Sequence, residues 1–67
     1  MRAEQYTKSI EKKRLAEAER YKGNEFMKSK EFDEAIAAYT RAIADDPKEP
    51  AAFSNRALAY LRQKKYT

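Results

Sequence analysis

The chain has 67 residues, which is near the lower limit for a protein that builds its own hydrophobic core, so it holds one small domain at most. It has no Cys and no His, which excludes disulfides, the common zinc sites, cysteine nucleophiles and an imidazole base, and we expect no metal and no cofactor. Its 15 Lys and Arg are interspersed with 11 Asp and Glu, and this small basic excess allows an acidic partner without requiring one.

The N-terminal part of the chain is charged throughout and holds no apolar run as long as a signal peptide or a membrane span. We therefore expect a soluble, cytoplasmic protein that has no contact with a membrane. The lack of Cys agrees with a reducing compartment but does not require one.

The first predicted element is helical and covers residues 1–29, which contain no Pro and a single Gly and are rich in good helix formers. Its beginning carries only a thin apolar stripe, formed by Ala3, Tyr6 and Ile10. This part either extends the next helix, lies against a neighbour or frays. The well-marked helix covers residues 15–29.

Gly23 is the predicted point of closest approach to another helix, because a residue without a side chain lets a neighbouring backbone or ring come near. The side chains expected to pack around it come from the same helix: Ala18, Tyr21, Phe26 and Met27.

A turn at residues 29–31 leads into the second predicted helix. Asp33 is a favourable N-cap, and small and apolar side chains continue from there to Ala44. The helix ends before Asp46 and Pro47. Pro47 and Pro50 mark a short linker, since each lacks a backbone donor and biases the residue before it away from helix.

The third predicted helix covers residues 51–64 and repeats the pattern of the first. Residues 55–66 align with residues 21–32 at an offset of 34 positions, and size and chemistry recur pair by pair. The pairs include Lys22 with Arg56, Gly23 with Ala57, Phe26 with Tyr60, Met27 with Leu61 and Phe32 with Tyr66. One helical hairpin of this length cannot bury its apolar face alone, so the period predicts stacked units. Proteins of this kind bind other molecules more often than they transform them.

Small residues, aromatic residues and one closing proline recur at fixed places in the chain: Gly23, Ala35, Ala42, Phe26, Phe32, Tyr39 and Pro47. In these residues the chain resembles the tetratricopeptide (TPR) repeat, a helix-turn-helix unit of 34 residues. The resemblance implies an all-α fold with an N-terminal helical extension at residues 1–15, a first repeat at 16–49 and the first helix of a second repeat at 50–67. Glu19 and Lys22 depart from the family pattern, which usually has Trp and Leu at these positions.

Two segments, KGNEF and SNRALAY, resemble the TPR co-chaperones, which are adaptors that bind the acidic C-terminal tails of the 70- and 90-kDa heat-shock chaperones. In that subfamily a cation, an Asn one turn later and an Asn of the next repeat clamp the carboxylates of a Glu-Glu-Val-Asp tail. Arg20, Asn24 and Asn55 match these three, and Arg62 could line the same groove. The resemblance therefore implies a protein-protein interaction module whose partner is an acidic C-terminal peptide.

The family clamp also uses a Lys and an Arg of a third repeat, so these 67 residues carry half of it. Because hydrogen bonds to charged groups contribute roughly 1.5–3 kcal/mol each, we expect the chain alone to bind the tail weakly or not at all. The alternative interpretation of Asn24 and Asn55 is that they are ordinary polar groups on a helix surface. Several lysines are interpreted as a solvated face: Lys22, Lys28, Lys30, Lys64 and Lys65.

The alternative function is self-association through apolar residues of the third helix, which the next helix would cover in a longer array. These residues are Phe53, Leu58, Tyr60, Leu61 and Tyr66. Large exposed apolar patches usually mark association surfaces, so we expect a homo-oligomer, most simply a dimer formed by helix exchange or end-to-end stacking. A partly ordered fragment is the remaining alternative.

Two other classes of function are disfavoured. Aromatic rings between basic residues could stack single-stranded nucleic acid, but most of these rings fall on packing positions of the repeat. Glu17, Glu19 and Glu25 could act as acid and base only in a pocket that shifts a carboxylate pKa, and one and a half hairpins enclose none. We expect neither nucleic-acid binding nor catalysis.

Overall fold

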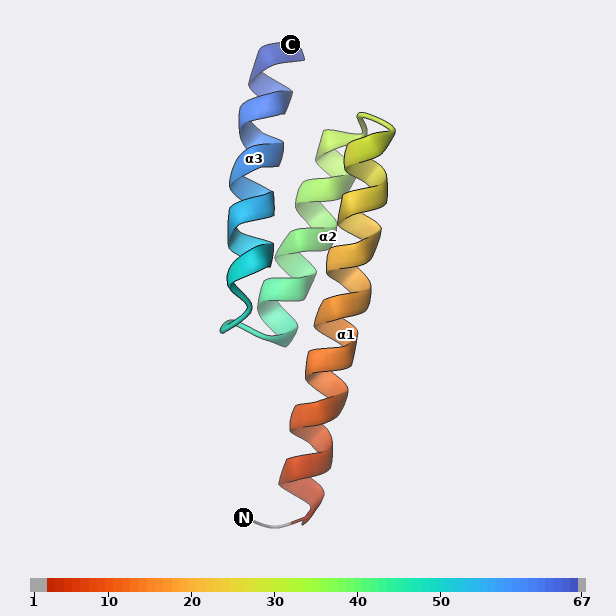
Figure 1. Cartoon of the computed structure of the whole chain (residues 1–67), viewed down its shortest axis with the longest axis vertical. Helices are drawn as coiled ribbons and strands as arrows, with labels where there is room; N and C mark the ends of the chain where they lie inside the picture. Colours follow the sequence, from red (N-terminus) through yellow and green to blue (C-terminus); the bar gives the residue numbers. More distant parts are fainter. Residues whose placement is uncertain (1–2, 67) are drawn as a thin grey trace.

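The computed structural model describes the backbone of residues 3–66 and the side chains of residues 10–65. In this part of the chain there are three helices and no strand: α1 (Ala3–Lys28), α2 (Phe32–Asp45) and α3 (Pro50–Tyr66). α1 and α2 form an antiparallel hairpin, and α3 runs back along α2 in the direction of α1 (Figure 1). α3 packs chiefly against α2 and touches α1 at few points. The predicted all-α fold is confirmed.

α1 is one unbroken helix that passes through residue 15 and continues beyond the end of the hairpin, so its N-terminal part projects away from α2 and α3 (Figure 1). Of the alternatives for the start of the chain, the structure shows the helical extension for residues 3–15. Ile10 is half-buried, whereas the side chains of Ala3 and Tyr6 lie outside the described residues.

The turn between α1 and α2 lies at residues 29–31, as predicted, and closes the end of α1 with two backbone hydrogen bonds. The Glu31 amide donates to the Phe26 carbonyl at 2.9 Å and the Lys30 amide donates to the Met27 carbonyl at 3.1 Å. This is the Schellman arrangement, which requires a left-handed residue, and Lys30 takes it with a φ of 61°. The turn thereby satisfies carbonyls that α1 would otherwise leave unpaired.

The prediction that Asp33 is the N-cap of α2 was wrong. α2 begins at Phe32, so Glu31 is the N-cap, and no side chain caps this helix end. The reason is that the chain has already reversed at Lys30, and the Glu31 carbonyl accepts the first hydrogen bond of α2 from the Ala35 amide at 3.0 Å. Asp33 instead lies in the first turn, where its negative charge suits the helix dipole, and its carboxylate accepts a hydrogen bond from Gln63 of α3.

Small side chains fill the contacts between the helices. One cluster joins Ala16, Ala42 and Ala52 from the three helices. A second joins Ala35, Tyr39 and Ala59, with Phe26, Met27 and Ile36 packed against it. Because alanine side chains are small, the backbones of the helices lie close together. Polar side chains at the edges of these contacts can therefore reach from one helix to another.

Gly23 permits the closest approach, as predicted. A Cβ at this position would lie 2.5 Å from Cε1 of Tyr39, so the ring occupies the space that any side chain would need. The accompanying prediction for Ala18 and Tyr21 was wrong, because both are exposed on the outer side of α1. They point away because α1 presents Gly23 to α2, and residues two and five positions earlier turn to other faces of the helix.

The linker between α2 and α3 includes Pro47, as predicted. The Asp46 amide donates to the Ala42 carbonyl at 2.9 Å and so closes α2, and the Glu49 amide donates to the Asp46 carbonyl at 3.1 Å. Pro50 belongs to α3 rather than to the linker, at the first helical position, where a missing backbone donor costs nothing.

Candidate functional site

All three helices contribute to one polar site at the edge of the core. Asn24 lies on α1 directly after Gly23, Tyr39 lies on α2, and Asn55 lies on α3. The ring of Tyr39 is held against Gly23, which brings its hydroxyl to the level of the next residue, Asn24. The glycine therefore determines how near the hydroxyl comes to the amide.

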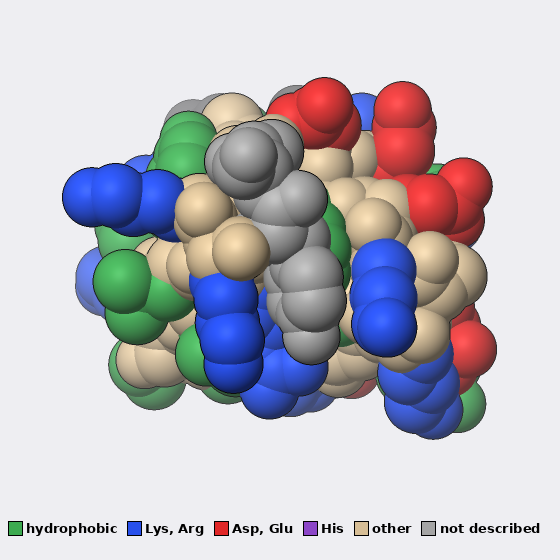
Figure 2. All heavy atoms as spheres, turned by 90° about the horizontal axis from the view of Figure 1, so that it is seen from above, with side chains coloured by type: hydrophobic (Ala, Val, Ile, Leu, Met, Phe, Trp, Pro, Cys, Tyr) green, Lys and Arg blue, Asp and Glu red, His purple; other side chains and the backbone are tan. Residues whose placement is uncertain are grey.

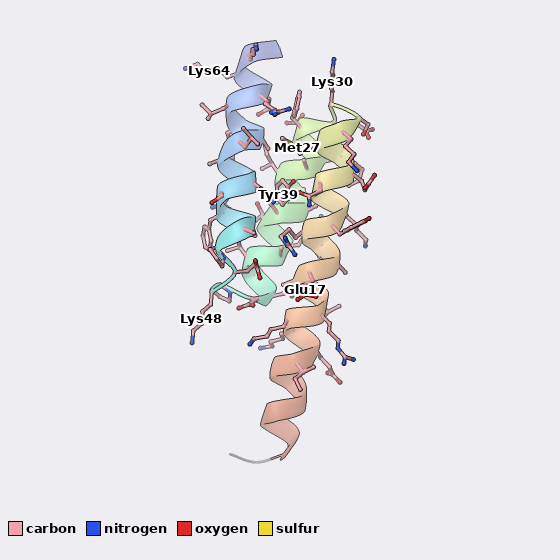
Figure 3. All side chains as sticks on the ribbon, viewed as in Figure 1. Glu17, Met27, Lys30, Tyr39, Lys48 and Lys64 are labelled. Carbon is pink, nitrogen blue, oxygen red and sulfur yellow. The ribbon has the colours of Figure 1, made fainter. Side chains whose placement is uncertain are left out.

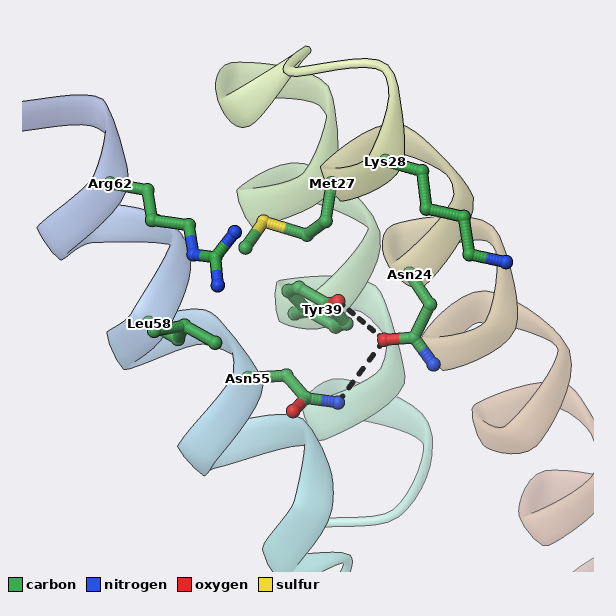
Figure 4. Close-up of a pocket in the computed structure, with 7 residues that line it drawn as sticks. All are labelled: Asn24, Met27, Lys28, Tyr39, Asn55, Leu58 and Arg62. Atoms are coloured by element: carbon green, nitrogen blue, oxygen red, sulfur yellow. Dashed lines mark hydrogen bonds between the residues drawn. The ribbon is translucent and has the colours of Figure 1, made fainter. Parts of the chain in front are cut away.

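The Asn24 side chain is the centre of this site. Its Oδ1 accepts a hydrogen bond from the Tyr39 hydroxyl at 2.6 Å and a second one from Nδ2 of Asn55 at 3.3 Å (Figure 4). The second bond joins α1 to α3 across residues 31 positions apart. The two asparagines thus lie side by side, although α1 and α3 otherwise hardly touch.

A pocket of about 190 Å³ opens beside these residues. It is lined by Asn24, Met27, Lys28, Tyr39, Asn55, Leu58 and Arg62. Figure 4 shows Asn55, Leu58 and Arg62 reaching from α3 toward Asn24 and Met27 on α1. On α3 these three residues are spaced by three and four positions, which puts them on one helix face. The pocket therefore combines amide donors and a guanidinium with an apolar floor.

Lys28 also lines the pocket, but its ammonium group leads away from Arg62 (Figure 4). Its Nζ lies 3.3 Å from Oε1 of Glu25, one turn earlier on α1, and the side chains of both residues are largely exposed. Lys30 in the α1–α2 turn, Lys48 in the α2–α3 linker and Lys64 near the end of α3 likewise project outward (Figure 3). The five lysines interpreted as a solvated face are all exposed, in agreement with that interpretation: Lys22, Lys28, Lys30, Lys64 and Lys65.

Arg20 is half-buried and is not among the residues that line the pocket. Its Nε is buried without a hydrogen-bond partner among the described residues. Burial raises the pKa of the Tyr39 phenol, and the positive charge of nearby Arg20 opposes that rise. The structure thus brings together three of the four predicted clamp residues, Asn24, Asn55 and Arg62, and places Arg20 beside them, close to Tyr39.

Sequence reasoning missed Tyr39 and Met27 as residues of the site. The sequence pattern predicts that both pack in the core, and Tyr39 is indeed only 1% exposed. The spacing held a signal for Met27, because it follows Asn24 by three positions, as Leu58 follows Asn55. Nothing in the spacing indicated that the hydroxyl of a packed ring would reach an asparagine.

The residues predicted for self-association are exposed to different degrees and lie on more than one side of α3. The exposed fractions are 42% for Phe53, 41% for Leu58, 53% for Tyr60 and 67% for Leu61. Phe53 and Tyr60 are two helical turns apart and share one side, whereas Leu58 lines the pocket beside Arg62. The side chain of Tyr66 lies outside the described residues.

The charges are unevenly distributed at the end of the molecule that carries the α1–α2 turn and the C-terminal end of α3. Seen from this end, Lys and Arg side chains gather along one edge, and Asp and Glu side chains gather at the opposite corner (Figure 2). Within residues 3–66 no helix has the length and apolar character to cross a bilayer. Among the described side chains no group of acidic residues could hold a metal ion.

The chain matches the model of one protein family and is similar in sequence to several curated proteins. A family model described as TPR repeat matches residues 23–64. RNA polymerase II-associated protein 3 of Gallus gallus is 47% identical over 55 residues, which cover 82% of this chain and 8% of that protein. Hsp70-Hsp90 organizing protein 2 of Arabidopsis thaliana is 44% identical over 48 residues, which cover 72% of this chain and 8% of that protein.

Hsp70-Hsp90 organizing protein of Triticum aestivum is 45% identical over 49 residues, which cover 73% of this chain and 8% of that protein. The chain thus spans less than a tenth of the length of each of these relatives. No solved structure gave a significant match.

Proposed function

Because the chain belongs to the TPR repeat family, we propose that it is a peptide-binding adaptor module that holds the acidic C-terminal tail of a heat-shock chaperone of the 70- or 90-kDa class. Two observations support the proposal: the similarity to Hsp70-Hsp90 organizing proteins and the pocket between α1 and α3. The second carries more weight, because it places amide donors and a guanidinium at one spot. We also propose repeat boundaries at residues 16–49 and 50–67.

Each part of the pocket suits one part of such a tail. The terminal carboxylate would accept hydrogen bonds from Nδ2 of Asn24 and Asn55, which donate without adding a negative charge of their own. Arg62 would supply a charge-assisted bond to a carboxylate. Met27 and Leu58 would cover an aliphatic side chain next to the terminus. The basic edge in Figure 2 would favour the approach of an acidic segment.

Arg20 would act at the margin of this site. A buried guanidinium nitrogen without a partner is costly, by about 1–3 kcal/mol for an unsatisfied buried donor. A carboxylate bound next to Tyr39 would bring negative charge to this guanidinium. Arg20 would thus contribute to affinity by its charge, while the two asparagines and Arg62 contact the tail directly.

The test is a titration followed by NMR chemical shifts, because the half clamp predicts weak binding. The probe is a synthetic acidic peptide ending in Glu-Glu-Val-Asp with a free C-terminal carboxylate. We expect Asn55→Ala and Arg62→Ala each to lower the affinity about tenfold or more, since each removes a hydrogen bond to a charged group, a loss of roughly 1.5–3 kcal/mol. Asn24 is left unchanged, because its removal would also deprive the buried Tyr39 hydroxyl of its acceptor.

The matched control is Ser54→Ala, which changes an exposed neighbour of Asn55 that does not line the pocket. Its affinity should equal that of the unchanged chain. Shifts that map outside the pocket, or equal affinities for all four chains, would contradict the proposal.

A second candidate function is self-association through α3, and the exposure of its large apolar side chains favours it. Leu61, Tyr60 and Phe53 have no covering helix among the described residues, and Leu61 is the most exposed of them. We propose that a second copy of the chain packs on the exposed part of α3 around Leu61 and forms a dimer. The dimer would use Leu61 and its neighbours, while the pocket uses Asn55 and Arg62, so the two functions respond to different substitutions.

Sedimentation equilibrium over a range of concentrations tests the dimer. Leu61→Glu should shift the mass to that of the monomer, because it places a charge in an apolar contact, and should leave peptide binding unchanged. The control is Leu15→Glu, the same change at a leucine of α1 that is 55% exposed. A monomer at all concentrations for the unchanged chain, or equal masses for the two variants, would rule out this surface.

A further inference from the structure

The hydrogen bonds around Asn24 raise the question of which end of its amide faces Tyr39. A carboxamide offers an oxygen that accepts and an NH2 group that donates, and the two ends have nearly the same shape. A tyrosine hydroxyl can donate or accept, so a single contact of 2.6 Å between Tyr39 and Asn24 would fit both orientations. The environment of the hydroxyl must therefore decide between them.

The burial of Tyr39 decides in favour of the oxygen. The side chain is only 1% exposed, so its hydroxyl proton cannot rely on water, and Oδ1 of Asn24 is its hydrogen-bond acceptor within the described residues. If the amide turned over, this proton would be buried without an acceptor, which is unfavourable. In this orientation the same oxygen also accepts a hydrogen bond from Nδ2 of Asn55 at 3.3 Å.

Two donors result from this orientation. Both lone pairs of the Asn24 oxygen are used, and its NH2 group makes no hydrogen bond to another described residue. The Asn55 NH2 group gives one of its two hydrogens to Asn24 and keeps the other. Each of the paired asparagines therefore keeps an N–H group that is not donated to a described residue, while the Asn24 oxygen is engaged inside the protein.

We propose that Tyr39 is a positioning residue for the peptide site: its hydroxyl locks the Asn24 amide with the donor end free, and this makes the pocket select a terminal carboxylate over a terminal carboxamide. The inference rests on the proposed peptide-binding function. A carboxylate presents only acceptors to the two asparagines. A carboxamide presents one acceptor and one donor group, and with Asn24 locked its NH2 finds no acceptor on Asn24.

Tyr39→Phe separates this role from packing, because it keeps the ring against Gly23 and removes only the hydroxyl. Without the hydroxyl, Asn24 is free to turn its oxygen toward a ligand. The measured quantity is the ratio of affinities for two forms of the acidic peptide, one with a free C-terminal carboxylate and one with a C-terminal amide. We expect the ratio to fall by about 3- to 10-fold, the effect of one hydrogen bond.

The control is Tyr21→Phe, which removes the hydroxyl of an exposed tyrosine on α1 and should leave the ratio unchanged. A merely structural role for Tyr39 would weaken the binding of both peptides equally. A Tyr39→Phe ratio equal to that of the unchanged chain would therefore overturn the inference and leave the peptide-binding function standing.

A second measurement needs no ligand. If Tyr39 donates to Asn24, its hydroxyl proton is protected from exchange with water in the NMR spectrum, and Asn24→Ala abolishes the protection. A Tyr39 hydroxyl that exchanges as fast as that of Tyr21 would overturn the inference. If the proton is protected but neither peptide shifts the resonances of the pocket residues, the lock exists and the proposed function fails. If both peptides bind the unchanged chain equally, the inference fails and the peptide-binding function stands, so the two failures are distinguishable.

Discussion

Among single residues, Glu19 shows how a charge can occupy a position where TPR repeats usually have an aromatic ring. Its Oε2 accepts a hydrogen bond from Nε of Arg41 on α2 at 2.9 Å, and its Oε1 lies 3.6 Å from Nζ of Lys22. At this point the contact between α1 and α2 is an ion pair rather than ring packing. The hydrogen bond from Arg41 lowers the pKa of the Glu19 carboxyl, although its burial opposes this.

This ion pair predicts an acid-sensitive contribution to stability. Because the pKa of Glu19 is lower in the folded chain than its ordinary 4.5, the contribution is complete above that value and is lost as the pH falls through the folded pKa. Glu19→Gln should reduce the free energy of unfolding at pH 7 by about 0.2–1 kcal/mol, as for other partly exposed pairs. Urea unfolding at pH 7 and in the acid range should show this difference shrinking toward acid pH.

Glu17→Gln is the matched control, since Glu17 is exposed and makes no ion pair to another described side chain. Its stability should follow that of the unchanged chain at every pH. A Glu19→Gln variant whose deficit stays constant from neutral to acid pH would contradict the ion-pair explanation.

Among the helices, the packing of α1 against α2 depends strongly on a single position, Gly23. A glycine inside a helix usually destabilises it by about 1 kcal/mol relative to Ala. Here, however, Gly23 leaves the space that the Tyr39 ring occupies. The ring is fully buried, so it cannot withdraw from an added methyl group. The packing of α1 on α2, and through it the position of Asn24, therefore depends on the absence of a side chain.

We expect Gly23→Ala to lower the free energy of unfolding despite its better helix propensity. The gain in propensity is about 1 kcal/mol, whereas overpacking a buried contact costs about 1–3 kcal/mol. Urea unfolding measures the net loss, which should be about 1 kcal/mol. Glu25→Ala, at an exposed position of the same helix, should change stability by less than about 0.5 kcal/mol. An unchanged or higher stability of Gly23→Ala would show that the ring can shift.

The whole molecule is long and thin, with extents of 48 × 17 × 13 Å. Its core is built mainly from alanines, and Tyr39 is the one large side chain among the described residues that is fully buried. A chain of this size has a total stability of about 3–10 kcal/mol, so loss of one good contact is a large fraction of it. A bound tail in the pocket or a second copy on α3 would each add burial that three helices alone do not supply.

The sequence by itself determined the local features of this protein. The helices, the turn at residues 29–31, the linker at Pro47 and the close approach at Gly23 follow from residue periodicity, Pro and Gly, which act over a few neighbouring positions. The period of 34 residues indicated the TPR family, and the family model agrees. The resemblance to the TPR co-chaperones likewise assigned Asn24 and Asn55 to one site, and the two side chains are hydrogen-bonded to each other in the structure.

Only the tertiary structure decided how these helices are rotated against one another. That rotation brings the Tyr39 hydroxyl to Asn24, turns Tyr21 to the outside and leaves Arg20 beside the pocket rather than in its lining. It also pairs Glu19 with Arg41, which lie 22 positions apart. Such contacts depend on how closely the helices pack at Gly23 and at the alanines. This packing involves all three helices together, so the residue pattern along any one of them does not predict it.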